Sequence, residues 1–273
     1  MYTYMWCLLF FFIGLFCGSL VNVIAGGLTR EPRSFVFSNC RQCSGRWPFY
    51  LMIPVVGFIL SRGKCNLCRS PLKVHILLVE LGAGLLFAYL VFRYGLTWEL
   101  SLSIFYALLL LIVLVTDIEK MLIPNAVTYP GFLMVLLLST AIMLLHFRPP
   151  WSFLLPVGGN FEWLNNYLWN SIVGCLAGFL LLLLVVIISR GGMALGDVKL
   201  AALIGLMLGF PMVLVGLFVA VIGGGLAAIV LLIARRKGKK DPIPFGPFLC
   251  LGALVTMLWG KELLRWYLSP LML

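Results

Sequence analysis

The stretch Tyr167–Ser189 reads YLWNSIVGCLAGFLLLLLVVIIS and carries no charged side chain. A run of roughly 20 apolar residues crosses the hydrocarbon core of a bilayer as a helix. Such a span cannot be a strand, because lipid offers no hydrogen-bond partner to the backbone. The 273-residue chain is 63% hydrophobic and 11% charged. The sequence therefore predicts an all-α polytopic membrane protein with about eight transmembrane helices, at 5–25, 76–94, 99–116, 126–146, 167–189, 198–216, 214–234 and 244–260.

The basic residues are distributed unevenly between the two sides of the predicted bundle. If the segment 26–75 faces the cytosol, 16 of the 20 Lys and Arg residues lie on the cytosolic side and four lie opposite. This asymmetry follows the positive-inside rule and predicts that both termini lie outside the cytosol. The first charged residue is Arg30, so we expect an uncleaved anchor rather than a signal peptide. The net charge of +11 thus reflects topology in the cytoplasmic (inner) membrane, with lipid and not nucleic acid as the partner.

One segment is polar enough to form a small domain. Between residues 26 and 75, Arg, Cys, Ser, Gly and Pro replace the Leu and Phe of the flanking spans. We therefore predict three parts: a first transmembrane helix at 1–25, a cytosolic insert at 26–75, and a membrane core at 76–273.

Four cysteines of the insert have the spacing of a zinc site. Cys40 and Cys43 form one C-x-x-C pair, and Cys65 and Cys68 form a second, with 21 residues between the two pairs. Each pair places two sulfurs on one tight turn, and two such turns complete a tetrahedron around Zn²⁺. Four sulfur ligands leave no open position, so the metal would be structural and would supply folding energy to a segment with little core. Disulfides or a redox dithiol are the alternative, which a reducing cytosol disfavours.

Two aspartates are candidates for chemistry because carboxylates at membrane depth are costly. Asp117 closes the third predicted span and Asp197 opens the sixth, both at the cytosolic face. If the fold brings them together, they would share one proton, since neighbouring like charges cannot both ionise. One aspartate could then activate a water as a base, and the other could donate a hydrogen bond to the attacked carbonyl oxygen. The alternative is that headgroups solvate both side chains.

Helix dipoles suggest which aspartate holds the proton. A carboxylate is stabilised at a helix N-terminus and disfavoured at a C-terminus. This predicts that Asp197 carries the charge and Asp117 the proton. Glu119 would face elsewhere on the helix, Glu80 is expected to have a structural role near a helix N-terminus, and Lys199 is expected to extend toward the interface or to tune Asp197.

Short motifs accompany the aspartates and cysteines along nearly the whole chain. They are Gly18-Ser19-Leu20-Val21-Asn22-Val23, Arg62-Gly63-Lys64-Cys65, Val79-Glu80-Leu81, Asp117 with Ile123-Pro124-Asn125 and Thr128, Gly196-Asp197-Val198-Lys199-Leu200, and Ile243-Pro244-Phe245-Gly246-Pro247-Phe248. Together they resemble the bacterial type IV prepilin peptidases, membrane aspartic proteases with a Gly-x-Gly-Asp motif. Ala194 departs from that motif at its first Gly, and residues 72–77 depart from the usual pattern of the insert.

The resemblance implies a function. Asp117 and Asp197 match the catalytic aspartates of the family, whose substrates are prepilins and pseudopilins with a short basic leader that stays in the cytosol. Members with a four-cysteine insert also N-methylate the new N-terminal residue with S-adenosylmethionine, although the resemblance assigns no residue here to that methyl donor. Two other readings remain: a proton- or cation-coupled transporter using the same aspartates, and a non-catalytic subunit of a pilus or secretion assembly. The sequence does not indicate an oligomeric state.

Overall fold

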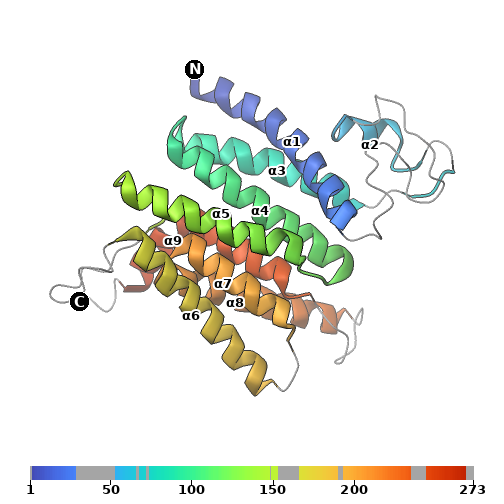
Figure 1. Cartoon of the computed structure of the whole chain (residues 1–273). Helices are drawn as coiled ribbons and strands as arrows, with labels where there is room; N and C mark the ends of the chain where they lie inside the picture. Colours follow the sequence, from blue (N-terminus) through green and yellow to red (C-terminus); the bar gives the residue numbers. More distant parts are fainter. Residues whose placement is uncertain are drawn as a thin grey trace. The chain divides into compact units, whose positions relative to one another are not determined.

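The computed structural model describes residues 2–28, 53–65, 68–71, 74–147, 149–152, 166–189, 193–234 and 244–268. In these ranges the chain is helical, and the β-type pairing is one isolated bridge between Lys64 and Pro71. The helices, coloured along the chain in Figure 1, are α1 (Tyr2–Leu28), α2 (Val56–Leu60), α3 (Val74–Tyr94), α4 (Trp98–Lys120), α5 (Asn125–Leu144), α6 (Tyr167–Ile188), α7 (Leu195–Leu208), α8 (Met212–Ile233) and α9 (Gly246–Leu268).

Seven helices in the described part of the chain are long and apolar enough to cross a membrane: α1, α3, α4, α5, α6, α8 and α9. The predicted all-α polytopic class is confirmed. The sixth predicted span, at 198–216, corresponds to α7, which has only 14 residues. At 1.5 Å per residue it rises about 21 Å, less than the roughly 30 Å hydrocarbon core. It ends at Gly209, whose φ of 75° lies in the left-handed region that favours glycine.

Helix α7 is held by hydrogen bonds at its C-terminal end. The last carbonyl groups of a helix have no partner inside the helix and need donors from elsewhere. The carbonyl oxygen of Met207 accepts hydrogen bonds from Trp151 Nε1 at 3.2 Å and from Tyr167 Oη at 3.3 Å. Every residue of α7 from Leu200 to Leu208 is buried. A short buried helix thus carries Asp197 at its other end.

The chain divides into two compact units, residues 1–116 and 117–273. In the first unit α1 packs along α3, as Figure 1 shows. A Cβ at Gly14 would lie 2.6 Å from the carbonyl oxygen of Ala83, and one at Gly18 would lie 2.8 Å from the Cα of Glu80. Small residues on α1 therefore let the two helix backbones approach closely, as in many membrane helix pairs.

Glu80 connects the insert to this helix pair. Its side chain is 6% exposed, and its Oε2 accepts a hydrogen bond of 2.8 Å from the backbone N–H of Val55. The Ser19 hydroxyl on α1 donates a second hydrogen bond to the same carboxyl group. Because α3 begins at Val74, Glu80 lies in its second turn. Its described partners fit the structural role expected for it.

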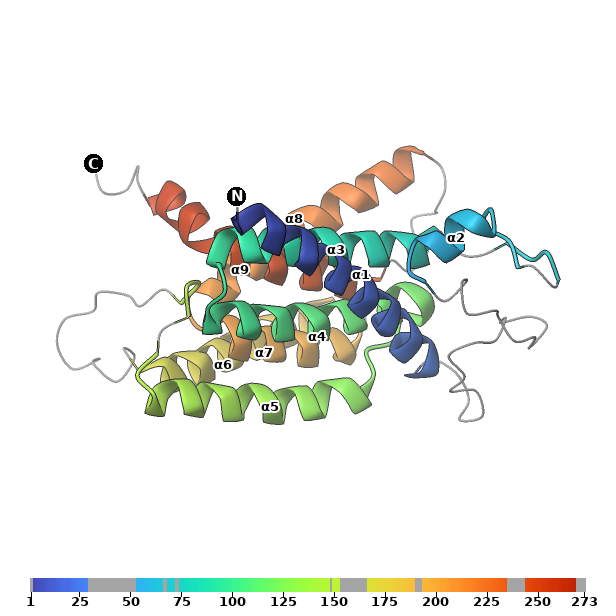
Figure 2. The same ribbon diagram turned by 90° about the horizontal axis from the view of Figure 1, so that it is seen from above.

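In the second unit α6 packs on α7 and α8 packs on α9, which Figure 2 shows from above. The contact between α6 and α7 is backbone against backbone. A Cβ added to Gly205 would collide with the carbonyl oxygen of Gly174, and one added to Gly174 would collide with that of Gly205. Dispersion contacts between the two backbones replace side-chain packing at this crossing.

Replacing Gly205 with Ala should therefore separate α6 from α7 and lower the free energy of unfolding by about 1–3 kcal/mol, the usual cost of overpacking. The thermal unfolding midpoint of the detergent-purified protein measures this effect. Gly225→Ala on α8 is the matched control, because a Cβ there meets no atom within 4 Å. Equal midpoints for the two variants would contradict the close-packing interpretation.

Candidate active site

Asp117 lies in the last turn of α4, which ends at Lys120, four residues beyond the end of the span predicted at 99–116. Its backbone carbonyl accepts a hydrogen bond of 2.8 Å from Met121, whose φ of 51° turns the chain away from the helix. The side chain is 4% exposed. The carboxyl group accepts a hydrogen bond from the backbone N–H of Gly246, whereas its Oδ2 is buried and has no hydrogen-bond partner among the described residues.

Asp197 lies in the first turn of α7 and is 6% exposed. Ala194 is the N-cap residue, and its backbone N–H donates a hydrogen bond to the Asp197 carboxyl group. This is the reciprocal half of a capping box, in which the third helical residue satisfies the N–H of the cap. Ala194 has a φ of −80°, an ordinary conformation for any residue. The Ala in place of the first Gly of the motif is therefore compatible with the local backbone.

The two aspartates come from helices far apart in the sequence, yet their carboxyl groups interact electrostatically. A third buried side chain, Cys250 on α9, interacts electrostatically with both of them and is 0% exposed. Asp117, at the end of α4, belongs to the second unit together with α7 and α9, so that unit contains the whole buried acidic cluster. Two neighbouring buried carboxyl groups are suited to share one proton, which gives one acid and one base in the same place.

The N-terminus of α9 changes the expectation drawn from helix dipoles. In the sequence, Asp117 lies at the C-terminus of one predicted span and Asp197 at the N-terminus of another, and no second helix end is apparent near either. In the structure Asp117 also accepts the Gly246 N–H at the start of α9. Each carboxyl group accepts a hydrogen bond from a backbone N–H at a helix N-terminus. The helix dipoles therefore do not show which aspartate is charged and which is protonated.

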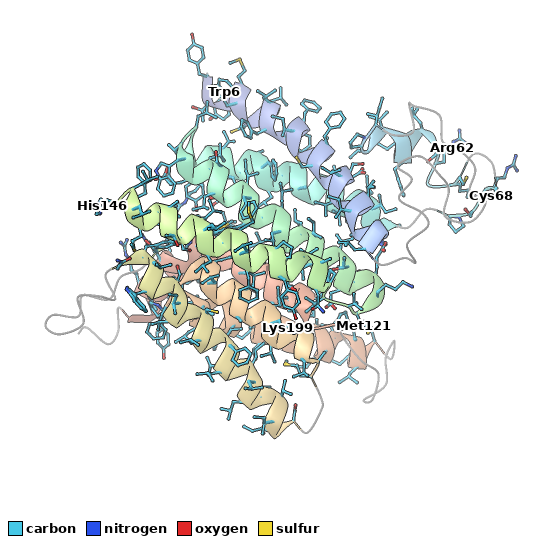
Figure 3. All side chains as sticks on the ribbon, in the orientation of Figure 1. Trp6, Arg62, Cys68, Met121, His146 and Lys199 are labelled. Carbon is cyan, nitrogen blue, oxygen red and sulfur yellow. The ribbon has the colours of Figure 1, made fainter. Side chains whose placement is uncertain are left out.

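Lys199 connects the start of α7 to the start of α5. Its Nζ lies 3.4 Å from Asn125 Oδ1, 3.3 Å from Tyr129 Oη and 5.4 Å from the centroid of the Tyr129 ring. Figure 3 shows Lys199 and Met121 toward one end of this unit and His146 toward the other. The partners of the Lys199 ammonium group thus lie on α5. The sequence had instead suggested that Lys199 extends toward the membrane interface or tunes Asp197.

The cysteine cluster is only partly described. Cys40 and Cys43 lie outside the described residues, so the four-sulfur site stays a prediction. Cys65 is buried, and Cys68 is exposed with its sulfur 3.1 Å from the Ser70 hydroxyl oxygen. Their turn is closed by hydrogen bonds from Cys65 N to Ser70 O and from Arg69 N to Cys65 O, both 2.9 Å. No group of three or more metal-ligating side chains occurs among the described residues.

Two residues that lie beside the aspartates, Gly246 and Cys250, could not be identified from the sequence. Gly246 belongs to the quoted motif Ile243–Phe248 and Cys250 follows two residues after it, but nothing in the sequence connects either residue with the aspartates. Their spacing of four residues, which places both on one face of a helix, was the available signal. That signal could not show which face meets Asp117.

Comparison with known families covers most of the chain. Residues 12–94 match the model of the Bacterial Peptidase A24 N-terminal domain, and residues 104–229 match that of the Type IV leader peptidase family. The first match includes the four cysteines of the insert, and the second includes both aspartates. No solved structure matches the chain.

Curated relatives agree with the family matches. A protein of Bacillus subtilis (strain 168) named prepilin leader peptidase/N-methyltransferase is 30% identical over 232 residues, which cover 85% of each chain. Proteins of the same name from Stutzerimonas stutzeri and Pseudomonas aeruginosa are each 26% identical over 282 residues. These matches cover 94% of this chain and 92% and 91% of the respective relatives. The chain therefore belongs to the type IV leader peptidase family.

Proposed function

We propose that this protein removes the basic leader peptide from type IV prepilins or pseudopilins, with Asp117 and Asp197 as its catalytic residues, and N-methylates the new N-terminal residue. The observation that carries the proteolytic part is the buried, electrostatically interacting pair of carboxyl groups. Both aspartates lie in the part of the chain that matches the Type IV leader peptidase family.

The proposed chemistry needs only groups that the acidic cluster contains. The ionised aspartate takes a proton from a water as the oxygen of that water attacks the scissile carbonyl carbon. The protonated aspartate donates a hydrogen bond to the carbonyl oxygen as negative charge develops on it. The proton then passes to the leaving amine as the C–N bond breaks. Burial strengthens each of these interactions, because little water screens them.

The substrate and its side of the membrane follow from the charge distribution and the family. The relatives are named prepilin leader peptidases. We propose that the leader is cut at the cytosolic face of the inner membrane, the side where the positive-inside rule places Lys120 and Lys199. Both termini would then lie on the opposite side. A prepilin anchored in the same bilayer would present its leader to the two aspartates from the cytosol.

The proposal also includes two bound groups, a methyl donor and a structural metal ion. S-adenosylmethionine would supply the methyl group, as the word methyltransferase in the names of the relatives implies. A structural Zn²⁺ would be held by Cys40, Cys43, Cys65 and Cys68. The turn that contains Cys65 and Cys68 fits this role, because the bond from Arg69 N to Cys65 O closes it tightly and Arg69 has a φ of 56°. With four sulfur ligands the metal has no position for a reacting water.

Family membership favours proteolysis over the two alternatives left by the sequence. A transporter would use the aspartates to carry a cation, and a non-catalytic subunit would not need them. The matched family is one of leader peptidases, and the chain retains both aspartates within the matched segment.

The test is an assay of the purified protein with a prepilin from the same cell, in detergent or lipid, followed by mass spectrometry. We expect a product that lacks the leader and, when S-adenosylmethionine is added, carries one methyl group on its N-terminus. Omitting S-adenosylmethionine should leave cleavage intact, because the proposed proteolytic step does not use it. An uncut prepilin would contradict the proposed protease, and a cut but unmethylated product would contradict only the transferase.

A further inference from the structure

The first turn of α9 has one backbone donor that the helix itself does not use. Phe245 caps this turn, because its carbonyl oxygen accepts hydrogen bonds from Phe248 N at 3.0 Å and from Leu249 N at 3.1 Å. Pro247 has no N–H. The first N–H groups of a helix otherwise have no partner within it, so the Gly246 N–H is directed outward along the helix axis.

The Asp117 carboxyl group occupies the place to which this donor points. It accepts the hydrogen bond of Gly246 and lies so close that a Cβ on Gly246 would be 2.6 Å from Oδ2 and 3.0 Å from Cγ. Real Cβ atoms do not approach other heavy atoms so closely, so only glycine lets the α9 terminus reach Asp117 in this way. The Asp117 Oδ2 has no hydrogen-bond partner in the described chain although Asp117 is 4% exposed.

An unpartnered buried carboxyl oxygen costs free energy unless something is bound to it during function. Asp197 and the Cys250 thiol both interact electrostatically with the Asp117 carboxyl group. Oδ2 is therefore the oxygen of Asp117 left for the shared proton or the reacting water. In this interpretation the hydrogen bond from the Gly246 N–H fixes the plane of the Asp117 carboxyl group. Oδ2, and not Oδ1, then faces the shared proton or the reacting water.

We propose that Gly246 is a positioning residue for the cleavage reaction: its N–H orients the Asp117 carboxyl group, and its lack of a side chain permits the contact. The proposal rests on the proposed function, since it needs Asp117 to be catalytic. It adds a third segment of the chain, the N-terminus of α9, to the machinery assigned to the two aspartates.

The test compares Gly246→Ala with wild type and with Gly225→Ala in the prepilin cleavage assay. A Cβ at Gly246 displaces Asp117, so kcat should fall by about 100-fold, the loss typical of a misplaced catalytic group, while KM stays close to wild type. Gly225→Ala should cut at the wild-type rate, because its Cβ meets no atom within 4 Å. Cleavage by Gly246→Ala at the wild-type rate would overturn the proposal. Failure of the wild-type protein to cut would instead overturn the proposed function.

A pH profile separates positioning from a loss of folded protein. If Gly246→Ala merely unfolded part of the sample, the pH profile of kcat/KM would be scaled down without moving. If the substitution disturbs Asp117, the acidic limb of the profile should be displaced relative to wild type, whereas that of Gly225→Ala should not move. A profile that is scaled but not displaced counts against the proposal.

A measurement without a Gly246 variant covers the case in which Gly246→Ala does not fold. Because the Gly246 N–H has Asp117 as its partner, its hydrogen exchange should accelerate in Asp117→Ala, while the Phe248 and Leu249 N–H groups stay protected by Phe245. Exchange at Gly246 that is equally slow in wild type and Asp117→Ala would overturn the proposal.

Discussion

Asp117→Asn and Asp197→Asn should each lower the rate of prepilin cleavage by about a thousandfold, within the range that general acid–base catalysis contributes. Asparagine has nearly the shape of aspartate but cannot carry the shared proton or take one from water. The two side chains are 4% and 6% exposed and interact electrostatically, so the loss of either removes half of one catalytic pair. Quantitative mass spectrometry of the cleaved prepilin gives the rates.

Glu119→Gln is the matched control for this prediction. Glu119 lies two residues after Asp117 on the same helix but is less buried, and the family resemblance gives it no catalytic role. We expect its rate to stay within about twofold of wild type, as is usual for substitutions outside the core and the active site. Cleavage at the wild-type rate by both Asn variants would remove the aspartates from the mechanism, whatever the control does.

Replacing Cys40, Cys43, Cys65 and Cys68 together with Ser should reduce the zinc content from about one atom per chain to almost none, since structural zinc sites hold one ion on four ligands. Structural Zn²⁺ contributes about 10–16 kcal/mol of binding free energy in small zinc-finger peptides. The insert should therefore become sensitive to limited proteolysis. Cleavage of prepilin should suffer less than in the aspartate variants, because the metal takes no part in the proposed reaction.

Elemental analysis of the protein, purified without chelator, measures this effect. A variant with Cys7, Cys17 and Cys175 changed to Ser is the control, because these cysteines lie within the helices α1 and α6. It should retain the zinc of the wild type. Wild-type protein that contains no zinc but forms disulfides within the pairs 40–43 and 65–68 would contradict the metal site.

Hydrophobic runs predicted the helices well because lipid makes helix formation compulsory for a long apolar segment. The span drawn at 126–146 corresponds to α5, Asn125–Leu144, and the one at 167–189 corresponds to α6, Tyr167–Ile188. The predicted end of the span 198–216 was wrong, because the apolar sequence continues past Gly209 whereas helix α7 ends at Leu208. There the backbone conformation of one glycine, and not polarity, ends α7.

The aspartates could be selected from the sequence because charged residues in apolar surroundings are conspicuous. Their proximity in space could not be derived from spacing alone, since 79 residues and two complete helices, α5 and α6, separate them. The role of α9 was harder still to predict. A backbone N–H leaves no trace in a sequence, and Gly246 becomes informative only when Asp117 lies 2.6 Å from where its Cβ would be.

In the proposed mechanism Asp117 and Asp197 act as one catalytic unit, and a variant that lacks both carboxyl groups distinguishes this from independent action. Residual cleavage by Asp117→Asn/Asp197→Asn is compared with that of each single variant by mass spectrometry. If the pair is one unit, the second substitution removes nothing further, and the double variant should be within about threefold of the slower single variant. A double variant slower by the product of the two single effects would show that the aspartates act independently, which the proposed shared-proton mechanism excludes.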